Sequence, residues 1–575
     1  MNRRQLLASA AVLPFTTHSF TLRAANPGGV DQLTGRPLYD RYQLTLDRVL
    51  RGAQPSYTAE FLLEDLHGTP GRRFTNFSGD LSGRWIGSLA TSSAQFGERF
   101  PVLDKFVAQA VALQHREGYF GKSFNAANPG DDDMALLWGN GRLLVGLLEY
   151  HALNHDPQVL AAARNLGNFL LRIAPQFNSQ QMADEFNAAH FASSYICWTQ
   201  QTEGLAALFV ATGDTRYRDL CADIAARIER RPGDHVHGYL CSVRGVLDLY
   251  LATKDEKFLN RAIAAWNDVA QSGDLLITGG VPEAWSPKKK RTEGCAECDW
   301  LRLNLALHAA TGEAKYLDAA EDALFNEFAM NQFSTGDFGH AVLDDFGAPE
   351  SVQVRAWWCC TLHGLRAFPD VAHHTFRIRD NEVFFDLPLD GSLDTGSISL
   401  TSQSSLATDR RIRIKVLHAS APHALNIRKP AWSDSVKVIR NGRPHENSRV
   451  ENLRAGDQIE ASYDMSLRLT SADKVLSTRG RTAFHYGPWL LGASTAMQPE
   501  YFNELYPSNV LIAGSATRNS TPATERFTIP LAATTVDAIP AEFPGQKLKL
   551  DLRAVAEQTG HEPARWATSF LVRTS

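Results

Sequence analysis

Apolar positions recur with the period of an amphipathic helix from about residue 40 to about residue 370. Four segments repeat one plan, in which an apolar helix ends, a tight turn with Gly or Asp follows, and a second helix begins: 148–160, 208–217, 249–258 and 307–316. Helical hairpins that return about every 40–60 residues indicate stacked helix pairs. Because no polar capping repeat is visible, we predict that the pairs close into an (α/α)6-type toroid rather than an open solenoid.

The pattern changes after Phe376, where apolar and polar residues begin to alternate. Short alternating runs, 382–387 among them, are separated by residues that favour turns. Several such strands in succession predict an antiparallel β-sandwich over 376–494. The tail, 495–575, is predicted to form a second β-rich domain or to complete the sandwich. The predicted fold class is therefore α+β multidomain, with the helical toroid over 26–375.

Residues 1–25 have the features of an export signal. Arg3 and Arg4 precede an apolar run, Ala8 to Phe15, that is far shorter than the roughly 20 residues needed to span a bilayer. Paired arginines before such a run resemble a twin-arginine signal, which predicts a periplasmic or secreted protein. An ordinary unstructured N-terminus is the alternative. Twin-arginine export carries folded cargo, so a thiolate site would acquire its metal in the reducing cytoplasm.

The composition narrows the classes of partner. The 575 residues are 44% hydrophobic and 21% charged, with a formal net charge of −5. This balance gives no sign of binding to nucleic acid or to an anionic membrane, and no other apolar run is long enough to span a bilayer. Eleven Trp and fourteen Tyr supply rings that can stack on sugars, although such rings serve equally well in a core.

Four of the seven cysteines lie in two short clusters, Cys295 with Cys298 and Cys359 with Cys360, and the carboxylates Glu293 and Glu297 flank the first pair. Thiolates and carboxylates are good zinc ligands, and two clusters separated by a long loop are a common way to build a zinc site. Two alternatives stay open at this point. The cysteines can be buried small hydrophobic residues, or they can form disulfides in an exported protein.

Two further polar clusters stand in the helical part. Asp131–Asp133 come directly before a predicted helix, where acidic side chains favour the positive end of the helix dipole. His235 and His237 stand on a polar loop, where we expect them to face solvent or substrate rather than to bind a metal.

The order of several motifs resembles that of the zinc–cysteine glycoside hydrolases typified by β-L-arabinofuranosidases. Glu283-Ala-Trp and Glu293-Gly-Cys295-Ala resemble the run towards the family's Glu-Thr-Cys-Ala motif, and Cys359-Cys360 resembles its vicinal cysteine pair. In the β part, 427–432, 441–442, 455–457 and 479–488 follow the family's sandwich signature. Each motif alone is weak, but their shared order extends over most of the chain.

This resemblance implies a zinc ion held by four ligands: Glu293, Cys295, Cys359 and Cys360. It also implies that Cys359 is the nucleophile and Glu283 the acid/base of a retaining exo-glycoside hydrolase. The substrate implied is an L-arabinofuranoside-like or related sugar, as a glycoside or oligosaccharide. Retention requires a nucleophile and an acid on opposite sides of the anomeric carbon, and zinc deprotonates a coordinated thiol.

Two of the family's histidines are replaced here. Arg142 stands in the Ala-Gly-His-Leu setting, and Cys241 stands in the Gly-His-Ala-Val-Arg setting that ends at Arg244. We expect Arg142, Arg244, His235 and His237 to contact the sugar. Because Arg binds carboxylates bidentately, Arg142 predicts tolerance of, or preference for, a sugar with an acidic group. Alternatively, Arg142 pairs with the Asp131–Asp133 run.

Two other function classes remain open from the sequence. A Cys3Glu shell with no open position is by the usual rule structural, so the protein can be a non-catalytic sugar-binding protein with a structural zinc. A polysaccharide lyase also combines an α/α toroid with β-sandwiches, and it would use Tyr, His or Arg rather than Cys.

Overall fold

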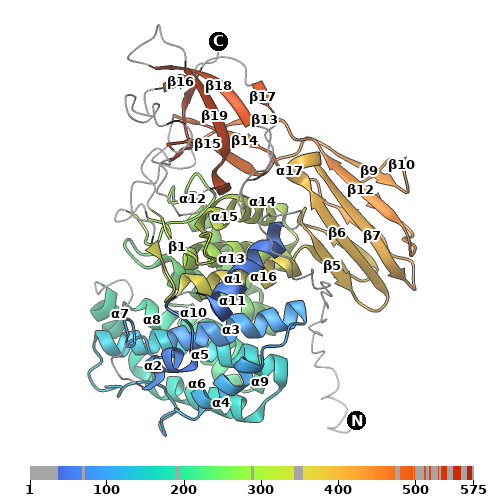
Figure 1. Ribbon diagram of the computed structural model, residues 1–575. Helices are drawn as coiled ribbons and strands as arrows, with labels where there is room; N and C mark the ends of the chain where they lie inside the picture. The colour runs from blue at the N-terminus through green and yellow to red at the C-terminus, as the bar shows by residue number, and fades with distance from the viewer. Residues whose placement is uncertain are drawn as a thin grey trace.

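The computed structural model describes residues 37–572, with gaps at 53, 68–71, 188–193, 287–290, 342–353, 473–479, 496–497, 499–509, 513–516, 520–528, 530–532, 541–547 and 558–565. The predicted export signal, 1–25, lies outside the described residues. A helical domain is followed along the chain by β-sheets (Figure 1). Within these limits, no helix is both long and apolar enough to cross a membrane.

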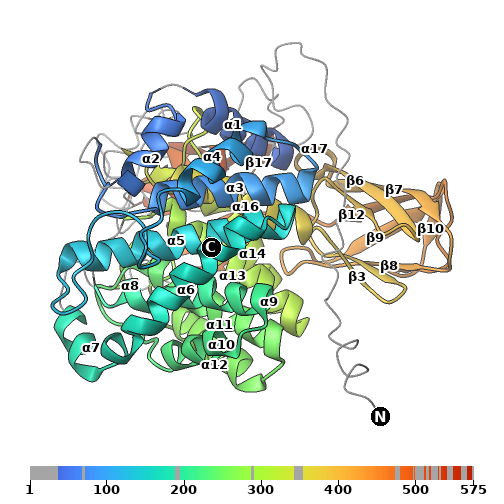
Figure 2. The same ribbon diagram turned by 90° about the horizontal axis from the view of Figure 1, so that it is seen from below.

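Six helices form a closed inner ring, in which each helix contacts the next and the last returns to the first: α3 (Asp80–Phe96), α5 (Asp131–Asn154), α9 (Gln201–Thr212), α11 (Val236–Thr253), α13 (Gly294–Thr311) and α16 (Cys360–His373). Six outer helices each pack mainly on one inner helix: α1 (Pro37–Arg51), α4 (Pro101–Val111), α6 (Pro157–Phe177), α10 (Thr215–Ala225), α12 (Glu256–Gln271) and α14 (Ala314–Asp322). The predicted α/α toroid is therefore confirmed (Figure 2).

Shorter helices complete this domain: α2 (Ala59–His67), α7 (Gln180–Asn187), α8 (Ile196–Thr199), α15 (Ala329–Asn331) and a π-helical turn over Ala323–Phe328. Inner helices are buried around most of their circumference, and 14 of the 17 residues of α3 are buried. Small residues let them approach closely. A Cβ on Gly83 would lie 2.5 Å from the backbone of Leu143 on α5, so only glycine fits there.

The repeated turns between helices have a local cause. Gly213 and Gly312 follow α9 and α13 with φ of 69° and 74°, a left-handed conformation that favours glycine. Asp214 and Asp255 precede α10 and α12, and each side chain accepts a hydrogen bond from a backbone N–H in the first turn. These stop and start signals are the ones from which the helical hairpins were predicted.

Two short strands, β1 (Gly339–His340) and β2 (Val354–Arg355), pair within the helical part of the chain. From Phe376 onward, strands first form two facing sheets around one core. The six-stranded sheet has the order β10-β9-β12-β7-β6-β5 and the four-stranded sheet the order β11-β8-β4-β3. The strands are β3 (Phe376–Arg379), β4 (Glu382–Phe385), β5 (Gly391–Asp394), β6 (Ile398–Ser405), β7 (Arg411–Ala419), β8 (Ala424–Ile427), β9 (Val436–Arg440), β10 (Arg443–His445), β11 (Arg449–Val450) and β12 (Gln458–Tyr463), with a short helix α17 (Leu406–Asp409). Neighbours are antiparallel except β4 and β8, which run parallel. These sheets project from one side of the helical domain (Figure 2).

A third sheet is built from β13 (Leu467–Ser471), β14 (Thr482–Tyr486), β15 (Trp489–Ser494), β16 (Val510–Ile512), β17 (Thr517–Asn519), β18 (Ala533–Pro540), β19 (Leu548–Ala554), β20 (Trp566–Ala567) and β21 (Leu571–Val572). Because β15 pairs with β19 and β20, the tail shares a sheet with strands before residue 494, which favours the second of the two predicted alternatives, completion of the preceding β structure, over a separate domain. Alternation of apolar and polar residues predicts that a segment is a strand, but it does not predict which other strand that segment pairs with.

Polar contacts attach the β-sheets to the helical domain. Asn326, on the π-helical turn, accepts a hydrogen bond from the backbone N–H of Leu490 at 2.8 Å and donates to the carbonyl of Pro488 at 3.1 Å. Glu321 on α14 pairs with Arg428 at 3.0 Å and accepts from the indole of Trp432 at 3.2 Å. All of these groups are buried or partly buried, so the junction is a packed interface rather than a flexible linker.

Candidate active site

The two cysteine clusters meet where inner helices begin. Glu293 directly precedes α13 and Cys359 directly precedes α16, while Cys295 and Cys360 lie in the first turns of these helices. The ring packs α16 against α13, which brings the two helix starts together. A helix N-terminus carries partial positive charge, which stabilises the thiolates and carboxylates placed there.

The geometry of this cluster suits a zinc ion. The ligand atoms of Glu293, Cys295, Cys359 and Cys360 all lie within 4.8 Å of one another. The Cys360 Sγ lies 3.5 Å from the Cys359 Sγ and 3.6 Å from the Cys295 Sγ. Tetrahedral zinc with Zn–S bonds of about 2.3 Å needs sulfurs about 3.8 Å apart. These residues therefore fit a Cys3Glu site, and the seven cysteines are all free thiols rather than disulfides.

Cys359 differs from the other two thiols. Its exposed fraction is 8%, whereas Cys295 and Cys360 are fully buried. Burial raises the pKa of Cys359, but the hydrogen bonds from Cys295 and Cys360 outweigh burial and hold it well below the usual thiol pKa. The charges of Arg84 and His340 lower it further. Burial keeps the pKa of Cys295 and Cys360 well above the usual value. The surroundings of Cys359 therefore favour its thiolate form, whereas those of Cys295 and Cys360 favour the thiol.

Backbone hydrogen bonds hold the segment around Glu283 beside the cysteine cluster. The Glu283 carbonyl accepts from the N–H of Val236, and its neighbours form isolated bridges to His235 and Thr292, which adjoin the cluster. The guanidinium of Arg291 donates to both carboxylate oxygens, one of them at 2.6 Å, and the Nδ1 of His340 lies 3.8 Å from one oxygen. Arg291 must therefore release Glu283 before that carboxyl group can donate a proton elsewhere.

His235 and His237 are both buried, so they do not face solvent, and their contact with a substrate stays a prediction. The Nε2 of His235 lies 2.8 Å from the Oε2 of Glu293, and its ring stacks on Trp138 with centroids 5.3 Å apart. Burial lowers the pKa of His235, but the Glu293 carboxylate more than offsets this and raises it above the usual value. His235 therefore orients one of the expected metal ligands.

His237 belongs to a second buried cluster with Asp299 and His363. Asp299 accepts from the Nδ1 of His237 at 2.5 Å and from the Nε2 of His363 at 2.9 Å. The other nitrogen of each ring faces the guanidinium of Arg84, at 2.9 Å and 3.2 Å respectively. Arg only donates, so both facing nitrogens accept and both imidazoles are neutral. The ring nitrogens that face Arg84 are not the ones that face Asp299, and the ligand atoms of these three residues lie within 4.8 Å of one another, so they form a second group whose spacing suits a metal ion.

Arg142 is also buried, and its partner differs from both expectations. Its guanidinium pairs with Glu203 at 2.9 Å and donates to the Cys241 Sγ at 3.2 Å. The alternative pairing with Asp131–Asp133 is wrong, because Asp133 caps its own helix by accepting from the N–H of Gly130. The charge of Arg142 is thus matched inside the protein, which removes the basis for an acidic-sugar preference.

Arg244 pairs with two buried carboxylates, Glu203 at 3.2 Å and Asp299 at 3.0 Å. Sequence reasoning missed four other residues around the cluster: Arg84, Asp299, His340 and His363. Two of them follow the helical period from a cysteine, because Asp299 is four residues after Cys295 and His363 three after Cys360. The other two carry no local signal.

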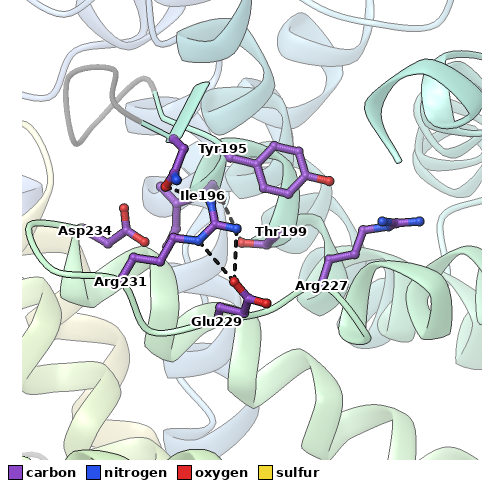
Figure 3. Close-up of a pocket in the computed structure, with 8 residues that line it drawn as sticks. Tyr195, Ile196, Thr199, Arg227, Glu229, Arg231 and Asp234 are labelled. Atoms are coloured by element: carbon purple, nitrogen blue, oxygen red, sulfur yellow. Dashed lines mark hydrogen bonds and ion pairs between the residues drawn. The ribbon is translucent and has the colours of Figure 1, made fainter. Parts of the chain in front are cut away.

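Aromatic side chains stand beside the nucleophile candidate. Trp358, directly before Cys359, stacks on His340 with centroids 6.2 Å apart and contacts Phe74 at 5.2 Å. A separate pocket next to α8 is drawn in Figure 3, with Tyr195, Arg227 and Arg231 among its lining residues. Arg231 there pairs with Glu229 at 3.1 Å, so its charge is already matched.

Comparison with known proteins agrees with this architecture. A solved GH127 β-arabinofuranosidase superposes with a TM-score of 0.72 at 16% identity, covering 97% of each chain. A GH127 β-L-arabinofuranosidase from Geobacillus stearothermophilus T6 gives 0.71 at 15% identity, covering 95% of this chain and all of that one. At such identities the likeness establishes the fold alone. No curated protein sequence matches the chain.

The family model described as β-L-arabinofuranosidase, GH127 catalytic domain, matches residues 52–373, which is more than half of the chain and nearly all of the helical toroid. The match includes every residue of the cysteine cluster and Glu283. The chain therefore belongs to the GH127 family and is a glycoside hydrolase of the β-L-arabinofuranosidase type.

Proposed function

We propose that the protein is a retaining exo-glycosidase that uses Cys359 as its nucleophile and removes a terminal β-L-arabinofuranosyl or closely related residue. The observation that carries the proposal is the asymmetry of the thiol cluster. Cys359 is the least buried of the three clustered thiols and the one with the lowered pKa. Zinc bound by Glu293 and the three cysteines would keep that thiol ionised.

The proposed reaction has two displacements. The Cys359 thiolate attacks the anomeric carbon as the bond to the leaving oxygen breaks, and Glu283 gives that oxygen its proton. Glu283 then takes a proton from water, and the water oxygen displaces the Cys359 sulfur. The second attack regenerates the thiolate and retains the anomeric configuration. His340, 3.8 Å from Glu283, is suited to hold the carboxyl group once Arg291 has moved away.

Family membership supports the choice of sugar. Two solved relatives carry β-arabinofuranosidase in their names, and the matched family model carries the same activity. A preference for acidic sugars is not part of the proposal, because the buried Glu203 already neutralises Arg142.

Zinc content and turnover test the proposal together. Purified, reduced protein is expected to hold about one zinc per chain and to release the phenol from an aryl β-L-arabinofuranoside. A strong chelator should stop turnover, and added Zn²⁺ should restore it. Cys360→Ala should lose zinc and activity. The matched control Cys298→Ala should keep both, because Cys298 is equally buried on α13 but lies outside the cluster.

Three outcomes would contradict the proposal. Sugar affinity without turnover would indicate a binding protein with a structural zinc. An unsaturated product that absorbs in the ultraviolet would indicate a lyase. Full activity in metal-free protein would exclude a metal-dependent thiolate nucleophile.

We also propose that residues 1–25 direct export through the twin-arginine pathway, on the strength of Arg3 and Arg4 before a short apolar run. Replacing both arginines by lysine should leave the enzyme in the cytoplasm. Unchanged export of that double variant would contradict the proposal.

A further inference from the structure

Arg84 lies between the cysteine cluster and a buried carboxylate. Its Nη1 donates to the Cys295 Sγ at 3.6 Å, and its Nε donates to the Oδ1 of Asp80 at 2.8 Å. Only 3% of the side chain is exposed. Water therefore does not screen its charge, and its position is held from several directions.

The charge of the expected metal site needs compensation. Three thiolates and one carboxylate carry four negative charges, and a divalent metal leaves two of them unmatched. Unmatched charge in a buried site is costly. Among the described residues, Arg84 is the one cationic side chain that contacts a sulfur of the cluster, while His235 contacts the Glu293 carboxylate.

The neighbouring histidines cannot supply that charge. The Nε2 of His237 and the Nδ1 of His363 both accept from Arg84, so both rings are neutral and direct their protons towards Asp299. Arg84 thus keeps its full positive charge, which it shares between Asp80 and Cys295.

We propose that Arg84 is the fixed counter-charge of the metal–thiolate cluster and that its hydrogen bond to Cys295 leaves Cys359 as the more nucleophilic sulfur. An N–H donor draws charge from the sulfur that it contacts. No N–H group of the described residues donates to the Cys359 sulfur, which contacts the thiols of Cys360 and Cys295 and the Glu293 carboxylate. Arg84 is therefore a positioning residue that acts through Cys295. The inference rests on the zinc of the proposed function.

Metal release without any sugar tests this inference. Zinc-loaded wild type, Arg84→Gln and Arg84→Lys are mixed with a chromogenic chelator, and the release rate is measured. Loss of a buried, charge-assisted hydrogen bond should speed release about 10- to 100-fold in Arg84→Gln. Arg84→Lys keeps the charge but not the fork of N–H donors, so its release rate should lie between those of wild type and Arg84→Gln. If the Gln variant does not fold, the release rate is measured in Arg84→Met, which should also release zinc faster than wild type.

Arg366→Gln is the matched control. Arg366 is as buried as Arg84 and pairs with Glu149 and Glu203, but no sulfur of the cluster contacts it. Its zinc release should equal that of wild type. Circular dichroism and thermal unfolding establish that each variant is folded before its release rate is compared.

A second readout uses Co²⁺ in place of zinc. Removing the donor from Cys295 should move the sulfur-to-cobalt charge-transfer absorption to longer wavelength in Arg84→Gln, and the Arg366→Gln spectrum should not move. Zinc release at the wild-type rate in Arg84→Gln, or equally fast release in the Lys and Gln variants, would overturn the role of Arg84. A wild type that binds no zinc would instead overturn the proposed function, and this inference with it.

Discussion

Two substitutions at the proposed site, Glu283→Gln and Cys359→Ser, should differ in how strongly their effect depends on the leaving group. Only a poor leaving group needs a proton, so loss of the acid should slow an alkyl β-L-arabinofuranoside by about 10²–10⁴-fold. That loss corresponds to about 3–5 kcal/mol of transition-state stabilisation. An activated nitrophenyl glycoside should slow by less than about tenfold in the same variant. Cys359→Ser should abolish both activities, because a hydroxyl is not ionised in this site.

The structure separates this effect from a loss of stability. Glu283→Gln keeps one of the two contacts with Arg291, whose side chain is 35% exposed. The Glu283 carboxylate is itself buried, so loss of its charge should lower the free energy of unfolding by about 1–3 kcal/mol, which still leaves the protein folded. The expected fall in activity on the alkyl glycoside is far larger than any change in folding can produce.

The assay measures kcat/KM on both substrates for wild type and both variants, followed by mass spectrometry of protein trapped with an epoxide-type sugar. A sugar adduct on Cys359 is the expected result. Equal losses on both substrates in Glu283→Gln would refute the acid role. An adduct on Glu283 would refute the nucleophile assignment. Glu297 is fully buried and accepts from the N–H of Val281, so an adduct there would contradict the structure as well.

Three further predictions concern stability and specificity. Arg142→Ala should lower the free energy of unfolding by about 3 kcal/mol in denaturant titrations; the loss is limited because Glu203 still pairs with two other arginines. In the same variant, kcat/KM should fall equally on neutral and carboxylated glycosides. Burial raises the pKa of Glu321 from 4.5 to about 7, so the folded state holds this proton more tightly than the unfolded state. The free energy of unfolding should therefore fall by about 3 kcal/mol from this group as pH rises from about 4.5 to 7. In Glu321→Gln, unfolding measured at several pH values should not show this fall. Gly83→Ala should lower the thermal midpoint more than Gly213→Ala, because only the first Cβ would strike a backbone, and equal shifts would contradict the packing argument.

The helical hairpins could be predicted because their signals are local. Gly213 with Asp214, and Gly312 in the corresponding turn, end one helix and begin another through contacts within a few residues. Such contacts depend on the nearby sequence alone. The same holds for the run of strands after Phe376. The grouping of strands into sheets could not be predicted, because β15 pairs with β19 across a separation of more than 50 residues.

The cysteine cluster was visible in the sequence as residue types, and the resemblance supplied its ligand set. The environment of each residue was not visible. His235 and His237 looked like loop histidines, yet ring closure buries them against Glu293 and Asp299. Arg142 looked available to a substrate, yet Glu203 from the next inner helix neutralises it.

The sequence by itself determined the helices, the strands and the chemical identity of the candidate ligands. Tertiary structure alone decided which charges face one another at the centre of the toroid. Arg84 has no motif around it, and it contacts Cys295 only because α16 packs against both α3 and α13 and closes the ring. The energies of buried charges depend on distance and on exclusion of water, and both of these arise only when the chain has folded.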